Sequence, residues 1–60
     1  MANDTSMITR ELAALRELEV ISERKERQCL AYIEKNRDEV QGWIDTMGVT
    51  AAADFVRDMA

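Results

Sequence analysis

At the centre of the chain stands Ser22-Glu23-Arg24-Lys25-Glu26-Arg27-Gln28, a run without a single apolar side chain. The segments on both sides of this polar belt (residues 22–28) have helical hydrophobic spacing, and no proline interrupts them. A polar run inside a long helical stretch cannot be ordinary core, because buried polar groups need partners. The polar belt must therefore be solvated, paired with another polar region, or in contact with a partner molecule.

Working outward from the polar belt, the composition predicts one long helix over about residues 7–35. This stretch is rich in Glu, Leu, Arg, Ala and Lys, which have high helix propensity. At about 100° per residue its apolar positions form one broad stripe, made of Ile8, Leu12, Leu15, Leu18, Cys29, Leu30 and Ile33. Ser22 and Glu26 interrupt the stripe, but an ion pair between Glu23 and Arg27 would support a continuous helix. The start could be capped by Asp4, Thr5, Ser6 or Thr9.

A turn near residues 36–37 is predicted to end this helix. Asn36 tolerates the left-handed conformation at a helix end, and it is also a good N-cap. The run Asn36-Arg37-Asp38-Glu39 has the form of a capping box, with Glu39 three residues after the cap. The alternative is an uninterrupted helix through Asn36, because Asn and Arg inside a helix cost only about a few tenths of a kcal/mol.

The second half of the chain predicts a helix over about residues 38–47 and a short helix over about residues 51–59. Gly48 follows the last apolar position of the first, where a C-cap glycine belongs, and Thr50 can cap the second. In one straight helix the apolar faces of the two parts would point about 120° apart. The first face is Val40, Trp43, Ile44 and Met47, and the second is Ala52, Phe55, Val56 and Met59. We therefore expect a kink or split near Gly48.

Folding the chain back at Asn36 makes an antiparallel helical hairpin. The polar belt then lies opposite the break at Gly48. A hairpin explains why these two interruptions match, whereas a straight rod does not. Two packed helices cannot enclose a core, and 60 residues with one cysteine and no histidine offer neither a disulfide nor a zinc cluster. We therefore expect a single all-α hairpin domain over residues 1–60 that dimerises into a four-helix bundle.

Some residues are candidates for contact with a partner or with a second copy. Val20 and Ile21 lie off the apolar stripe, although plain solvent exposure is an alternative for Val20. Tyr32 lies near the edge of the stripe, and Trp43 could be either a core anchor or a binding hot spot. The full set of candidates is Leu18, Val20, Ile21, Arg24, Lys25, Arg27, Tyr32 and Trp43.

The sequence offers no catalytic arrangement. Its central carboxylates, among them Glu19, lie on a helical surface beside Arg and Lys, which favours a solvated charged face. Cys29 falls on the apolar stripe, and no histidine exists to activate it. Two glycines, Gly42 and Gly48, do not make a phosphate-binding loop. We therefore expect no enzyme activity, no cofactor and no metal site.

Nucleic-acid binding is the alternative function. Residues 37–60 carry five acidic and two basic residues of a chain with net charge −4, so this half would repel a phosphate backbone. Residues 43–54 have the order of a helix-turn-helix, but the second helix would offer an acidic surface to the major groove. Contact with RNA by a hairpin dimer would use Arg24, Lys25 and Arg27, which acidic residues interleave.

The expected location is a reducing cytoplasm. No apolar run approaches the roughly 20 residues needed to cross a bilayer, so we expect no membrane span. The start Met1-Ala2-Asn3-Asp4-Thr5 lacks a basic region followed by an apolar stretch, so we expect no signal peptide.

Three segments carry a family resemblance: Glu17-Leu18-Glu19-Val20-Ile21-Ser22-Glu23-Arg24-Lys25, Tyr32-Ile33-Glu34-Lys35-Asn36-Arg37, and Trp43-Ile44-Asp45-Thr46-Met47-Gly48. Through them the chain resembles the small helical proteins encoded in the early exo–xis region of lambdoid bacteriophages. The resemblance implies an accessory regulator in the cytoplasm of a bacterial host, acting through contacts with a host or phage protein. It implies no catalytic residue.

Overall fold

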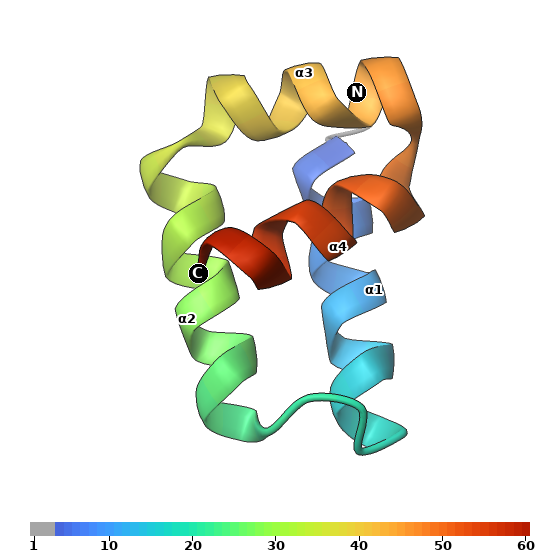
Figure 1. Ribbon diagram of the computed structural model, residues 1–60, viewed down its shortest axis with the longest axis vertical. Coiled ribbons are helices and arrows are strands. Elements are labelled where there is room, and N and C mark those ends of the chain that lie inside the picture. The colour runs from blue at the N-terminus through green and yellow to red at the C-terminus, as the bar shows by residue number, and fades with distance from the viewer. Residues whose placement is uncertain (1–3) are drawn as a thin grey trace.

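The computed structural model describes residues 4–60, which contain four α-helices and no strand. The helices are α1 (Asp4–Glu17), α2 (Glu23–Lys35), α3 (Arg37–Met47) and α4 (Val49–Met59). Helices α1 and α2 lie side by side and antiparallel, α3 crosses one end of the pair, and α4 packs across one face of it (Figure 1). The chain is all-helical, as predicted. Residues 1–3, which the predicted domain includes, lie outside the described residues.

The core lies where the four helices meet, and α4 contacts each of the other three. Its ten buried apolar residues are Ile8, Leu12, Ile21, Cys29, Ile33, Val40, Ile44, Ala52, Ala53 and Val56. One chain thus supplies four helices around its own core. The need for a second hairpin, which led us to expect a dimer, does not arise from this fold, and the dimer stays a prediction.

The predicted continuous helix over residues 7–35 is wrong, because residues 18–22 separate α1 from α2. Helix α1 ends in a Schellman turn, in which the Glu19 N–H donates to the Arg16 carbonyl oxygen at 3.0 Å. The Val20 N–H donates to the Leu15 carbonyl oxygen at 2.9 Å in the same turn. Glu19 takes its left-handed position with φ 62°, where glycine is usual.

Helix α2 begins inside the polar belt. The Ser22 hydroxyl accepts a hydrogen bond from the Lys25 N–H at 3.0 Å, which makes Ser22 the N-cap. Glu23 and Glu26 lie in the first turn, where the helix dipole favours negative charge. Arg16 Nε lies 2.6 Å from Glu26 Oε1 and ties α1 to α2. The polar belt is therefore a helix start that is mostly exposed, with Lys25 and Glu26 partly buried. Helices α1 and α2 make the antiparallel pair in place of the predicted long arm.

Asn36 and Gly48 separate the remaining helices. Asn36 forms no capping box, because its Nδ2 donates to the Tyr32 carbonyl oxygen at 3.1 Å instead. Gly48 alone joins α3 to α4, with φ 91° and ψ 167°, a backbone region that is essentially restricted to glycine. Helix α4 begins at Val49, so Thr50 lies inside it rather than capping it.

Four residues placed on apolar faces by their spacing are exposed, among them Met47 at 37%. Leu18 is 73% exposed, because α1 ends at Glu17 and the helical spacing that placed Leu18 on the apolar stripe does not continue to it. Phe55 and Met59 are 46% and 58% exposed. The buried face of α4 is instead formed by Ala52, Ala53 and Val56.

Replacing Glu19 by glycine should stabilise the chain. A non-glycine residue in the left-handed region is strained by about 1 kcal/mol, and Glu19→Gly removes most of that strain. Chemical unfolding followed by circular dichroism measures the gain. The control Glu17→Gly lies in the last turn of α1 and should lose about 1 kcal/mol. A loss at both positions would contradict the turn at residues 18–22.

The two glycines should respond to alanine with opposite signs. Gly48→Ala forces a side chain into a glycine-only region and should lower the free energy of unfolding by about 1–3 kcal/mol. Gly42→Ala lies within α3, where a Cβ meets no atom within 4 Å, and should raise it by about 0.5–1 kcal/mol. Thermal or chemical unfolding of both variants measures this. Effects of the same sign would contradict the break at Gly48.

Candidate interaction surface

Three aromatic rings form a row across three helices. Trp43 on α3 lies between Tyr32 on α2 and Phe55 on α4. Its ring centroid is 6.3 Å from that of Tyr32, with planes 15° apart, and 5.4 Å from that of Phe55, with planes 31° apart. The chain contains one Trp, one Tyr and one Phe, so all its aromatic residues meet here. We call Tyr32, Trp43 and Phe55 the aromatic row.

The aromatic row borders the core without being part of it. Tyr32 and Trp43 are half-buried and pack against the core, while Phe55 is 46% exposed. Two flexible apolar side chains extend this surface, since Met47 and Met59 follow Trp43 and Phe55 by one helical turn and are 37% and 58% exposed. Partly exposed aromatic rings beside methionines are typical of surfaces that bind other proteins.

Exposed charged residues lie beside the aromatic row. Residues three or four positions apart share one face of a helix. By this spacing, Glu39 lies one turn before Trp43 on α3, and Asp58 lies one turn after Phe55 on α4. On α2, Lys35 follows the tyrosine by one turn. Two carboxylates and one ammonium group therefore border the rings.

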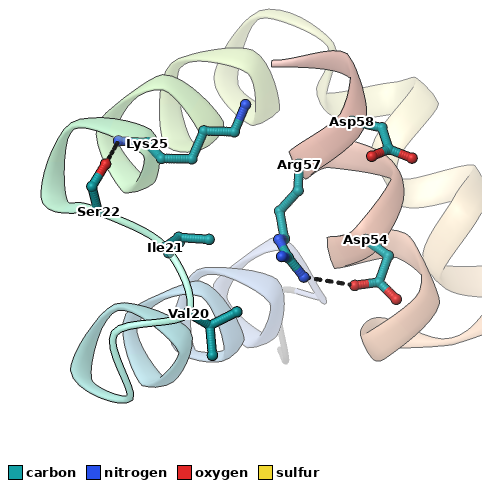
Figure 2. A pocket seen from close by; sticks show the side chains of 7 residues that line it. All are labelled: Val20, Ile21, Ser22, Lys25, Asp54, Arg57 and Asp58. Carbon is teal, nitrogen blue, oxygen red and sulfur yellow. Dashed lines mark hydrogen bonds and ion pairs between the residues drawn. The ribbon is translucent and has the colours of Figure 1, made fainter.

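The second candidate is an open groove of about 580 Å³ that lies between the connection 18–22, the start of α2 and the face of α4. Figure 2 shows Lys25 extending from α2 toward α4, and Arg57 pointing from α4 toward Val20 and Ile21. The groove is lined by Val20, Ile21, Ser22, Lys25, Asp54, Arg57 and Asp58. Arg57, Asp54 and Asp58 are residues that the sequence did not single out for this place.

The charged groups of the groove are matched within the chain. Lys25 Nζ donates to the Ala60 carbonyl oxygen at 2.8 Å. Arg57 Nη1 lies 3.1 Å from Asp54 Oδ1, as the dashed line in Figure 2 marks. With Asp58 on the same rim, two carboxylates balance two cations. This balance makes the groove a seam between helices rather than an ionic ligand site, and the aromatic row is the stronger candidate.

The structure divides the predicted contact residues among three places. Tyr32 and Trp43 come together in the aromatic row, and Phe55 joins them although its spacing placed it in the core. Arg24 and Arg27 lie exposed on α2, and the other four lie in residues 18–25. Of these, Leu18 and Val20 are exposed, and Lys25 lines the groove. Ile21 is only 8% exposed and belongs to the core of its own chain, although it also lines the groove, and its contact with a partner stays a prediction.

Cys29 is buried in the core. Burial raises the pKa of the Cys29 thiol, Lys25 and Arg57 partly oppose this shift, and Glu26 adds to it. A raised pKa keeps the thiol protonated at neutral pH, whereas a nucleophilic cysteine reacts as the thiolate. Among residues 4–60, no three or more His, Cys, Asp or Glu side chains are grouped to hold a metal ion. Nor does any helix in this range combine the length and apolar character needed to cross a membrane.

The ionisation of Cys29 should reduce stability at alkaline pH. Because the folded pKa lies above the unfolded one, the unfolded chain releases the proton first as pH rises. The contribution of the buried, protonated thiol to the free energy of unfolding is complete below the unfolded pKa, which is near 8.5 for an ordinary thiol. It is lost as pH rises through the folded pKa. The difference in free energy of unfolding between the native chain and Cys29→Ala should therefore shrink above about pH 8.5. A constant difference would contradict the burial of the thiol.

Comparisons with protein-family models, with curated proteins and with solved structures each give no match. The resemblance to lambdoid phage proteins therefore stays a hypothesis. The function has to be inferred from the residues and the geometry of the aromatic row.

Proposed function

We propose that the chain is a small, non-enzymatic protein–protein interaction module whose binding surface is the aromatic row. One observation carries this proposal: all the aromatic residues of the chain gather in a row that its own helices leave partly open. Tyr and Trp are enriched among the residues that carry most of the binding energy at interfaces. Their rigid rings cover a large area at low cost in conformational entropy.

The size of the chain agrees with a surface of this kind. A standard interface buries about 800 Å² on each partner, which is about a fifth of the 4215 Å² exposed by this chain. The three rings do not provide that area by themselves. The interface would therefore extend over the exposed faces of α3 and α4 and include Met47 and Met59.

The phage-type hypothesis points to the same surface. Two of the segments similar to lambdoid early proteins, residues 32–37 and 43–48, contain Tyr32 and Trp43. In this proposal the partner is a host or phage protein in a bacterial cytoplasm, and binding changes how much of it is available. Its effect would come from occupancy of the partner's surface rather than from chemistry.

Nucleic-acid binding receives less support from the contacts. Of the basic residues in the polar belt, Lys25 donates to the Ala60 carbonyl oxygen, and Arg27 Nη2 lies 3.9 Å from Glu23 Oε1. The helix that would enter the major groove in a helix-turn-helix is α4, whose exposed surface carries Asp54 and Asp58. A phosphate backbone would meet acidic groups there.

Capture from a bacterial lysate tests the proposed function. The immobilised chain should retain a specific protein, and Phe55→Ser should reduce its capture by at least about tenfold, because a hot-spot ring is removed. Met7→Ser is the matched control, since Met7 is 50% exposed and lies on α1. Circular dichroism of both variants checks that they fold. Equal capture by the two variants, or repeated capture of nothing specific, would contradict the proposal.

A further inference from the structure

Two of the three rings stand on helices with an acidic surface. Helices α3 and α4 contain five acidic residues, all exposed, and two arginines. One of these arginines, Arg57, is paired with Asp54. A molecule that approaches the aromatic row along α3 and α4 therefore meets a negative field, which speeds the association of positively charged partners.

Two of the carboxylates border the rings themselves. Glu39 shares a helix face with Trp43, and Asp58 shares one with Phe55. Lys35 lies beside Tyr32, and Asp58 also borders the groove that contains Lys25 and Arg57. Within residues 4–60, however, neither Glu39 nor Asp58 forms an ion pair.

The rings supply the second half of a cation site. The face of an aromatic ring attracts a cation within about 6 Å of its centroid, and tryptophan does so best. The row is partly exposed, most of all at Phe55 (46%), so a guanidinium can approach its rings from solvent. A carboxylate at the edge can then accept its N–H groups in a charge-assisted hydrogen bond.

A second copy of the chain fits this surface less well. In a two-fold symmetric dimer the same patch contacts itself, so the acidic surface of one copy would face that of the other. Like charges placed opposite each other suppress association. An acidic peptide and a nucleic acid meet the same repulsion.

From this juxtaposition of stacked rings and bordering carboxylates, we infer that the partner is a cationic protein segment that places an arginine or lysine over the aromatic row. The inference rests on the proposed function and specifies the chemistry of the partner. Apolar side chains beside that cation would contact Met47 and Met59, which are exposed next to the rings.

Three synthetic peptides of equal length and apolar content test the inference. They carry arginine, glutamine or glutamate at the same positions, and they contain no tryptophan. Trp43 is the one tryptophan of the chain, so its fluorescence reports binding at the row itself. The arginine peptide should bind at least about tenfold more tightly than the glutamine peptide, and added salt should weaken it. The glutamate peptide should bind least.

Charge-neutralising variants distinguish the effect of the two carboxylates beside the rings from the effect of net charge on peptide binding. Glu39→Gln combined with Asp58→Asn should reduce the arginine preference to below about threefold. The control combines Asp38→Asn with Asp45→Asn, which changes net charge equally at exposed positions that do not share the Trp43 face. This control should keep the preference. Equal effects of the two double variants would overturn the role of Glu39 and Asp58.

The remaining outcomes distinguish this inference from the proposed function. Binding of all three peptides with similar affinity, lost in Phe55→Ser, would overturn the cationic partner and leave the aromatic row as a binding surface. Binding of none of them would also overturn the inference. Light scattering over a concentration series tests self-association. A dimer that Phe55→Ser abolishes would assign the row to a second copy and overturn the inference too.

Discussion

Glu19 holds a left-handed backbone conformation at the end of α1, and the path of the whole chain depends on it. The Schellman turn at this residue and the Ser22 cap send α2 back along α1. A continuous helix over residues 7–35 would be about 43 Å long at 1.5 Å per residue, whereas the longest extent of the molecule is 27 Å. Only the folded-back pair leaves room for α3 and α4 to close the core. The ion pair from Arg16 to Glu26 ties the two helices together beside their connection.

Local sequence signals did not predict the break at residues 18–22, although they located the polar belt around it. This segment contains no glycine or proline, and Leu and Glu both favour helix. The available signal was Ser22, an N-cap residue followed by an acidic first turn. Burying a side chain such as Ile21 is worth about 1.5–3 kcal/mol, more than the roughly 1–2 kcal/mol of a left-handed Glu19. The gain from tertiary packing therefore outweighed the helix propensity of residues 18–22. Reasoning from propensity along the sequence does not include that gain.

The aromatic row was predictable in part. Tyr32 was a candidate because it lies near the edge of the apolar stripe, and Trp43 because it could be either a core anchor or a binding hot spot. Gly48 marked the break that brings α4 back over α3. Phe55 was not, because its spacing relative to Val56 suits a core face equally well. Helix α4 buries Ala52, Ala53 and Val56 against the other helices, and this choice of buried face leaves Phe55 46% exposed. Helix-crossing distances cannot be read from periodicity.

The placement of the aromatic residues is itself an argument about function. A chain of 60 residues buries only about 60% of its unfolded surface, so large apolar side chains are most valuable inside it. Here the fully buried positions hold isoleucine, leucine, valine, cysteine and alanine, while the rings lie at the edge. Fully burying a ring such as Phe55 would contribute about 1.5–3 kcal/mol, a sizeable share of the 5–15 kcal/mol typical of whole domains. A partner that covers the rings, as we propose, would recover that forgone stability. The turn at Glu19, which folds α2 back along α1, thereby contributes to the surface that Tyr32 and Trp43 present.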